Sequence, residues 1–382
     1  MEILSARALE GLKQYTYKPG GYTWLDRLHN PMWNWMVTKL PMWLAPNLIT
    51  LAGLVLMIIA YAVLWQMTPD FTGEAPSWAY YFAGISIVVY TNLDNLDGKQ
   101  ARRTGTSSPL GQLFDHGCDA LALHVMLSLV QTSLNEPSCT FTSIAATSVY
   151  LPWLISHWEE YHTGILMYGD GWFGILEANY VLAIITFISG TFGVGVYETP
   201  MQSLVPWWPW PMSVKHAFII FAMGISLVQF YGQMYRVFSR EWQSLPELER
   251  GNKELGTQPR LKHLAYVGLL ILVGIVYLAD DRLQPYQARV SALLYGLVYA
   301  TVATQLIMDH MCKEPFQPPL VPLGVLIAAM VNSLAQAVDG RALAFALAGF
   351  MLVYYSIYAT TVISQVTTYL GIRCLTITPK RA

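Results

Sequence analysis

Ten long apolar stretches dominate the sequence and leave few folds open to it. They lie near residues 46–66, 78–96, 113–134, 140–157, 175–196, 215–237, 263–279, 288–308, 320–337 and 343–371. The hydrocarbon core of a bilayer is about 30 Å thick, and a helix needs about 20 mostly apolar residues to cross it. Only 12% of the 382 residues are charged, whereas a soluble domain carries about 25%. The sequence therefore predicts an all-α integral membrane protein with about ten transmembrane helices.

The placement of Lys and Arg predicts how these helices cross the membrane. If the N-terminus is cytosolic, ten spans leave four of the 22 basic residues on the far side, namely Lys215, Arg282, Arg289 and Arg341. This asymmetry follows the positive-inside rule. We therefore expect a cytosolic N-terminal segment (1–45), a ten-helix transmembrane domain (46–371) and a cytosolic tail (372–382). The net charge of −2 argues against a nucleic-acid partner.

The N-terminal segment contains an amphipathic stretch. Asn30-Pro31 predicts a helix start, with Pro at the first helical position. The residues that follow place Met32, Trp33, Trp35 and Met36 beside Lys39. This composition favours a short helix lying on the cytosolic membrane face. The alternative is a coil that leads into the first span.

Four aspartates between residues 92 and 119 form the most informative cluster. Asp94 and Asp97 are three residues apart, and Asp115 and Asp119 are four apart, so each pair shares a helix face. The intervening TGTSSPLG breaks the helix and lets the chain turn back. Two helices would then direct two carboxylates each into one cavity. Acids at such positions in a membrane protein are usually functional.

Crowded carboxylates repel one another unless a cation lies between them. Oxygen ligands favour Mg²⁺, with Mn²⁺ as a substitute, over zinc or copper. Mg²⁺ usually binds through carboxylates together with substrate phosphates, so the cluster predicts a phosphorylated substrate. Two such ions bridging a diphosphate would stabilise a departing nucleotide.

The residues around the aspartates suit a nucleotide. Gly98, Ala101 and Gly111 are small enough to let a ligand approach the helix backbone. Arg102 and Arg103 offer guanidinium groups, which match phosphate oxygens. Two alternatives stay open. The acids could form a structural salt-bridge network with Lys99, Arg102 and Arg103, or they could line the path of a cation transporter.

The segment resembles a known signature. Written as D-x2-D-G-x2-A-R-x8-G-x3-D-x3-D, it is similar to the motif of the CDP-alcohol phosphotransferase family at Asp94, Asp97, Gly98, Ala101, Arg102, Gly111, Asp115 and Asp119. The stretches WMVTKLPMWLAPNLITLAG, SPLGQLFDHGCDAL, WEEYHTG and SQVTTYLGIRC resemble its eukaryotic choline/ethanolamine phosphotransferase branch.

This resemblance implies a reaction and a setting. The branch transfers phosphocholine or phosphoethanolamine from CDP-choline or CDP-ethanolamine to diacylglycerol, releasing CMP. A sister enzyme with another donor or lipid acceptor is the alternative. The family fold has six core helices, to which the branch adds four. The resemblance also implies a homodimer in the endoplasmic reticulum or Golgi, with the active site facing the cytosol.

The resemblance also assigns roles. It implies that Asp94, Asp97 and Asp115 bind the metal ions and that Asp119 is either a fourth ligand or the base. His116 is the rival base, and we favour it, with Asp119 as a ligand. The expected CDP-binding residues are Asn47, Asp94, Gly98, Ala101, Arg102 and Gly111. For Asn47 the alternative is a helix N-cap, because it follows Pro46.

A second polar cluster, HWEEYH, holds His157, Glu159, Glu160 and His162. Its histidines are five residues apart rather than the four of a zincin, which argues against zinc. For Glu159 or Glu160 we expect contact with the alcohol headgroup or support of the site, the alternative being a charged helix end. Glu177 follows a Gly-rich stretch that loosely resembles the family. Asp309 and His310 are expected at the membrane interface.

Overall fold

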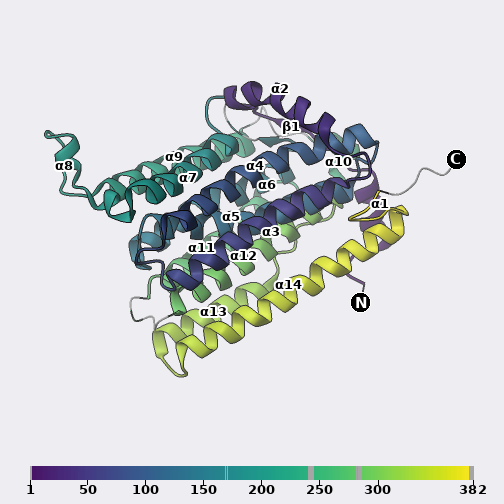
Figure 1. Cartoon of the computed structure of the whole chain (residues 1–382). Helices are drawn as coiled ribbons and strands as arrows, with labels where there is room; N and C mark the ends of the chain where they lie inside the picture. The colour runs from purple at the N-terminus through teal and green to yellow at the C-terminus, as the bar shows by residue number, and fades with distance from the viewer. Residues whose placement is uncertain are drawn as a thin grey trace.

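The computed structural model describes residues 2–167, 169, 171–239, 245–280, 282 and 286–377. Ten long helices make up most of it (Figure 1). They are α3 (Pro46–Met67), α4 (Ser77–Thr104), α5 (Pro109–Ser133), α6 (Thr140–Thr163), α7 (Ile175–Phe192), α9 (Val214–Phe238), α11 (Thr257–Leu278), α12 (Gln287–Met311), α13 (Leu320–Ala335) and α14 (Gly340–Leu370).

Each predicted apolar stretch is occupied by one of these helices. Within the described ranges, seven of them are long and apolar enough to cross a membrane. The other three are α4 and α6, which carry the acids discussed below, and α13, which has 16 residues. The prediction of an all-α integral membrane protein is confirmed.

Seven further elements complete the described chain. They are α1 (Ala6–Lys13), β1 (Pro19–Gly20), α2 (Trp24–Lys39), β2 (Leu166–Met167), η1 (Val194–Glu198), α8 (Met201–Leu204) and α10 (Glu247–Arg250). Strand β1 pairs in parallel with β2.

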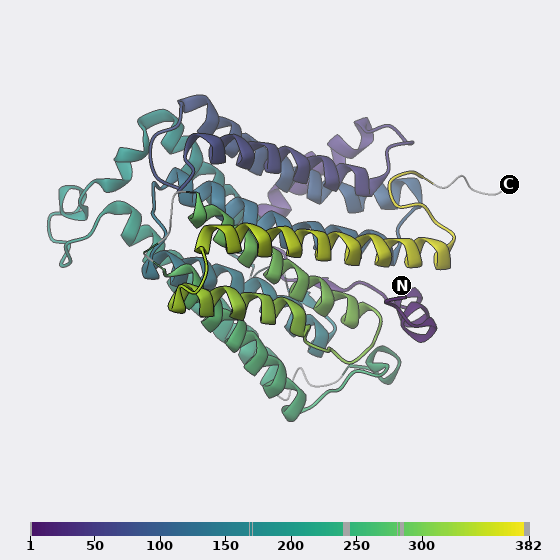
Figure 2. The same cartoon turned by 90° about the horizontal axis from the view of Figure 1, so that it is seen from below.

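Helix α12 lies inside the bundle and is buried along most of its length. It packs against α5, α6 and α14, while α3 and α7 pack on either side of α4. Figure 2 shows α14 along the outside of the bundle. Gly84 allows the close approach of α4 to α7, because a Cβ there would lie 2.4 Å from the Thr186 hydroxyl oxygen. These contacts fix the helices that carry the site.

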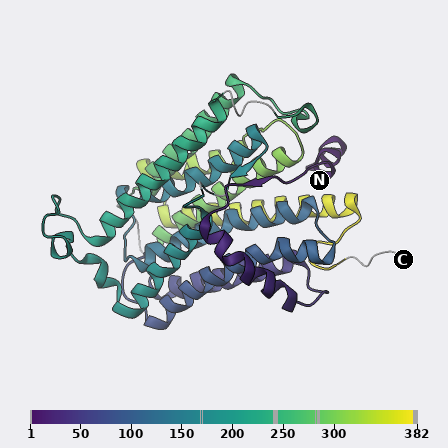
Figure 3. The ribbon, with the colours of Figure 1, turned by 90° about the horizontal axis from the view of Figure 1, so that it is seen from above.

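Helix α2 crosses the bundle obliquely instead of joining it (Figure 3). It begins at Trp24, so the predicted start at Asn30-Pro31 is wrong. The Thr23 side chain accepts a hydrogen bond from the Asp26 backbone, and the Asp26 carboxylate accepts one from the Thr23 backbone. This capping box starts the helix earlier. Trp35 is 62% exposed whereas Trp33 is buried, as an interfacial helix requires.

The segment from residue 14 to residue 23, which joins α1 to α2, is here called the N-terminal strap. Its strand β1 pairs with β2, just beyond the end of α6. Helix α1 contacts α12 and α14, and the Tyr369 hydroxyl donates a hydrogen bond to Glu10 (2.7 Å). The N-terminal segment is thereby held against the end of the bundle that carries the aspartates.

Candidate active site

The turn between α4 and α5 brings the two aspartate pairs together. Gly105 ends α4 in the left-handed conformation, with φ of 68°, which glycine adopts at little cost. Ser108 then caps α5 by accepting a hydrogen bond from the Gly111 backbone (3.2 Å), and Pro109 occupies the first turn. The two helices therefore run back along each other, and their acids share one end of the bundle.

Three of the four carboxylates form a tight group. Oxygen atoms of Asp94, Asp115 and Asp119 all lie within 4.8 Å of one another. One oxygen of Asp94 and one of Asp115 are buried without a hydrogen-bond partner among the described residues. Asp97 is nearly buried and accepts a hydrogen bond from the Thr50 hydroxyl. Asp119 accepts one from the Tyr90 hydroxyl (2.7 Å).

This donor set fits a hard divalent cation. The cluster consists of carboxylate oxygens, which are the ligands that Mg²⁺ and Mn²⁺ prefer. Buried carboxylate oxygens without a partner are costly, and a cation between them would remove that cost. The three residues His116, His157 and Glu160 also approach within 4.8 Å of one another, but Glu160 already accepts a hydrogen bond from Tyr15.

The nearby cations do not neutralise the acids. Lys99 donates to the side-chain oxygens of Asn30 (2.6 Å) and Asn34 (2.8 Å) on α2. Arg103 donates to the carbonyls of Val37 and Leu40, each at 2.7 Å. No salt bridge joins either residue, or Arg102, to the four aspartates in the described part of the chain. The salt-bridge network considered above is wrong.

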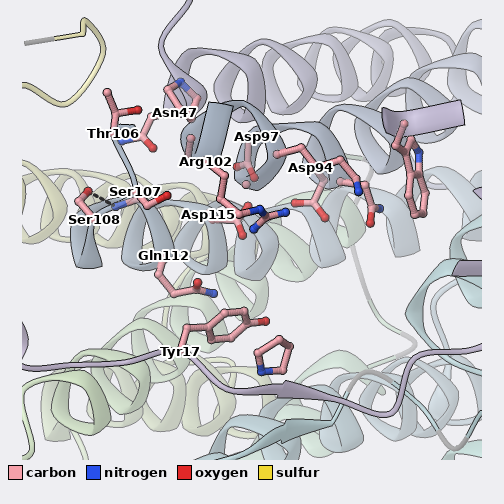
Figure 4. A pocket seen from close by; sticks show the side chains of 18 of the residues that line it. Tyr17, Asn47, Asp94, Asp97, Arg102, Thr106, Ser107, Ser108, Gln112 and Asp115 are labelled. Carbon is pink, nitrogen blue, oxygen red and sulfur yellow. Dashed lines mark hydrogen bonds between the residues drawn. The ribbon is translucent and has the colours of Figure 1, made fainter. Parts of the chain in front are cut away.

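A cavity of about 1420 Å³ opens beside the aspartates. Its wall includes Asp94, Asp97 and Asp115, the strap and the segment after α14. Figure 4 shows these acids and Arg102 gathered on one side, with Tyr17 of the strap on the other. Arg102 is exposed to the cavity and has no ionic or hydrogen-bond partner among the described residues. Its guanidinium is therefore free to bind an anion.

Two glycines predicted to bind the nucleotide line this cavity without tight contacts to the protein. A Cβ at Gly98 would meet nothing closer than the Arg102 guanidinium at 3.5 Å. A Cβ at Gly111 would lie 3.6 Å from the nearest atom, an Asn47 oxygen. Internal packing therefore does not demand glycine at either position. Ala101 lines the same wall. A ligand that approaches the backbone closely would explain these small residues.

Asn47 lies in the second position of α3 and does not cap it. Ala45 is the N-cap and makes no side-chain hydrogen bond, so the N-cap interpretation of Asn47 is wrong. The Asn47 amide instead donates to the Cys374 carbonyl (3.0 Å) and lines the cavity. It thus joins the start of the first span to the segment that follows the last one.

His116 is buried one helical turn beyond Gln112, which lines the cavity. The His116 Nε2 atom lies 2.5 Å from the Gln112 side-chain amide. The ring of His157 flanks it, with centroids 5.0 Å apart. His116 and Asp119 are not themselves in the cavity wall. They lie directly behind it, on the same helix as Asp115.

The three glutamates occupy different surroundings. Glu159 accepts a hydrogen bond from Arg236 on α9 (2.9 Å) and does not line the cavity. Glu160 faces the His116 cluster. Glu177 accepts a hydrogen bond from the Gly174 backbone (3.0 Å), and its other oxygen is buried without a partner in the described chain.

Several residues at the site were not predicted from the sequence. Thr50 lies one helical turn after Asn47, and Tyr90 lies one turn before Asp94, so helical periodicity could have found both. His310 was expected at the interface but is buried, and its Nε2 atom lies 3.4 Å from Glu160. Lys253, whose pKa burial lowers to about 7, lies 2.7 Å from the His310 Nδ1 atom. Nothing in the sequence indicates these long-range contacts.

Comparisons with known proteins identify the family. Residues 43–215 match the model of CDP-alcohol phosphatidyltransferases. A Dictyostelium discoideum protein described as uncharacterized CDP-alcohol phosphatidyltransferase class-I family protein 3 is 30% identical over 99% of both chains. Cholinephosphotransferase 1 of Homo sapiens is 28% identical over 82% of this chain and 74% of its own. That of Danio rerio is 25% identical over 99% of this chain and 97% of its own. This chain belongs to the CDP-alcohol phosphatidyltransferase family and is a transferase of that class.

Proposed function

We propose that this enzyme transfers phosphocholine, phosphoethanolamine or both from the CDP-alcohol to diacylglycerol, giving the phospholipid and CMP. Similarity to cholinephosphotransferases over most of the chain supports this assignment. The observation that carries it is the unpaired Arg102 beside a cluster of unneutralised carboxylates in one cavity. Acids that hold a cation, next to a guanidinium, are the groups that bind a diphosphate.

Asp94, Asp97, Asp115 and Asp119 would hold two Mg²⁺ ions, or Mn²⁺ in their place. The partnerless oxygens of Asp94 and Asp115 fit this role. When bound, these ions supply charge neutralisation of the diphosphate and of the departing CMP. The hydrogen bonds from Thr50 and Tyr90 orient Asp97 and Asp119 beforehand, as supporting hydrogen bonds do at metal sites.

The nucleotide would lie against the exposed backbone of α4 and α5. Arg102 would bind phosphate oxygens, and Gly98, Ala101 and Gly111 would let CDP approach the helices. Asn47 would contact the nucleotide from the start of α3. All five line the cavity.

His116 would be the base for the lipid hydroxyl. The hydroxyl oxygen of diacylglycerol attacks the phosphorus of the phospho-alcohol group, and its proton passes to the His116 imidazole. The bond from that phosphorus to the CMP oxygen breaks in the same displacement. Asp119 would be a ligand, and its position in the acidic cluster supports this role. No covalent enzyme intermediate is required.

Glu177 would contact the cationic headgroup of the alcohol. Its partnerless buried oxygen favours a positive partner, since burying a lone carboxylate is costly. Leu176 and Asn179, on either side of it, line the cavity.

The enzyme would reside in the endoplasmic reticulum or Golgi as a homodimer, with the site and both termini in the cytosol. Helix α1 and the end of α14 lie at the end of the bundle that holds the aspartates (Figure 1), which agrees with this orientation. A cation transporter is disfavoured, because the four acids gather at that end and Arg102 would repel a passing cation.

The purified protein in diacylglycerol liposomes tests the proposal. It should release CMP and form the phospholipid from CDP-choline or CDP-ethanolamine only when Mg²⁺ or Mn²⁺ is present. Transfer from CDP-diacylglycerol to a soluble alcohol, with none from either CDP-alcohol, would identify a sister enzyme instead. Ion flux through liposomes without any transfer would contradict the proposal altogether.

A further inference from the structure

We infer that Glu160 is the positioning residue for His116: one buried carboxylate fixes both rings that flank it. This inference rests on the proposed role of His116 as the base. It concerns a residue that touches neither substrate nor cation but acts through the groups around the base.

Glu160 connects four separate parts of the chain. It is 2% exposed, and its Oε1 atom accepts a hydrogen bond from the Tyr15 hydroxyl of the strap (3.0 Å). The Nε2 atom of His310, on α12, lies 3.4 Å from the same oxygen. The His157 Nδ1 atom lies 3.5 Å from Oε2. His310 in turn contacts Lys253, in the loop before α11, at 2.7 Å.

Two aromatic rings contact His116: one belongs to His157, which lies beside Glu160, and the other to Tyr17, close in sequence to a residue bound to Glu160. The His157 ring packs against His116 with centroids 5.0 Å apart, and its Nδ1 makes no hydrogen bond in the described structure, so the nearby carboxylate is its polar neighbour. The Tyr17 ring packs on His116 edge to face, with centroids 6.0 Å apart. Tyr17 lies two residues after Tyr15, whose hydroxyl is bound to Glu160.

The strap therefore both lines the cavity and contacts His116. Figure 4 shows Tyr17 across from Gln112, on the side opposite the aspartates. Since Gln112 also lies 2.5 Å from the His116 Nε2 atom, the base is enclosed by Gln112, Tyr17 and His157. Without the Glu160 carboxylate, His157 and the strap would each lose a polar contact and become more mobile. The His116 imidazole would then no longer be held in one orientation. Small displacements of a catalytic group reduce the rate strongly.

The neighbouring Glu159 provides a matched control. It has the same charge, lies on the same helix and is as deeply buried as Glu160. Its carboxylate binds Arg236 of α9 and makes no hydrogen bond or ion pair with the rings around His116 in the described part of the chain. Substituting it removes an ion pair and costs stability without disturbing the base.

The inference can be tested with four variants assayed in diacylglycerol liposomes: Glu160→Gln, Tyr15→Phe, the double variant of these two, and Glu159→Gln. We expect Glu160→Gln to lower kcat about 10- to 100-fold while the KM for the CDP-alcohol changes less than about threefold. Tyr15→Phe should lower kcat less, and the double variant should be no worse than Glu160→Gln alone, because both act on one contact. Glu159→Gln should keep kcat within about twofold although its melting temperature falls.

An unchanged kcat in Glu160→Gln would overturn the inference. The inference would also fail if Glu160→Gln and Glu159→Gln lost kcat equally, in proportion to the fall in their melting temperatures. That result would show that both glutamates have a structural role only. Should Glu160→Gln not fold, Tyr15→Phe decides, and normal turnover there is the contrary result. His116→Ala separates the proposed base from the positioning role. If His116→Ala retains turnover, His116 is not the base. If His116→Ala is inactive while the Glu160 and Tyr15 variants are normal, His116 remains the base and the positioning role of Glu160 is wrong.

Discussion

The Tyr90 hydroxyl on α4 donates a 2.7 Å hydrogen bond to one oxygen of Asp119 on α5. The bond occupies that oxygen and joins the two helices at the level of the acidic cluster. The Asp119 carboxylate also lies within 4.8 Å of oxygen atoms of Asp94 and Asp115, which supports its proposed role as a cation ligand. His116, three residues before Asp119 on the same helix, is the base in our proposal.

Tyr90→Phe should weaken the use of Mg²⁺. Without its hydroxyl, Asp119 is no longer held toward the other acids, so the Mg²⁺ concentration for half-maximal activity should rise about 10-fold. Headgroup transfer over a Mg²⁺ titration measures this. Tyr80→Phe is the control, because Tyr80 is equally buried on α4 but its hydroxyl binds the Ala75 backbone. A shift of equal size in both variants would contradict a local effect.

Arg102 and Arg103 should respond differently to alanine. Arg102 has no partner in the described structure and lines the cavity, so Arg102→Ala should raise the KM for the CDP-alcohol about 10- to 100-fold with little loss of stability. Arg103 binds carbonyls of α2, so Arg103→Ala should lower the melting temperature and leave KM nearly unchanged. Steady-state kinetics and thermal melts distinguish them, and the reverse pattern would exclude Arg102 as the phosphate ligand.

Gly111→Ala should stabilise the protein and weaken its binding of the CDP-alcohol. Alanine is better than glycine in a helix by about 0.5–1 kcal/mol, and its Cβ would meet no atom closer than 3.6 Å. The same methyl group would occupy the space proposed for CDP, so KM should rise at least about 10-fold. Gly349→Ala, on an open face of α14, should give the stability gain alone. Full activity in Gly111→Ala would show that no ligand approaches this backbone.

Lys253 should make stability increase with pH above neutrality. Burial lowers the pKa of Lys253 from 10.5 to about 7, although the Glu160 and Glu249 carboxylates oppose this and Lys313 reinforces it. The unfolded chain therefore keeps a proton between these pH values that the folded protein has released, so stability rises with pH across that window. Melting temperatures from pH 7 to 10 should show this rise in the wild type and a shallower one in Lys253→Met. Identical slopes would place the titration elsewhere.

Local patterns in the sequence predicted the helices and the acidic cluster well. The ten long helices follow from the apolar runs of the sequence, and the pairing of Asp94 with Asp115 follows from a helix break and periodicity. The start of α2 was missed because the Thr23–Asp26 capping box outweighs Pro31, which lies inside the helix. The role of Asn47 was ambiguous because its partner, Cys374, lies at the far end of the chain.

The surroundings of His116 could not be predicted for the same reason. Tyr15 and Glu160 are separated by 145 residues, and Lys253 and His310 by 57. No periodicity links such positions, because tertiary packing alone brings them together. The sequence therefore indicated the chemistry of the acids but not the side chains that surround His116.

Binding of Mn²⁺ in the presence of CDP tests the central claim most directly. Electron paramagnetic resonance of the purified protein should show Mn²⁺ bound tightly when CDP is added, and Asp94→Asn with Asp115→Asn should abolish both this signal and headgroup transfer. The metal-free double variant should melt at a higher temperature than the wild type, because two repelling charges are gone. Undiminished Mn²⁺ binding in the double variant, with CDP present, would contradict the assignment of these acids as the cation site.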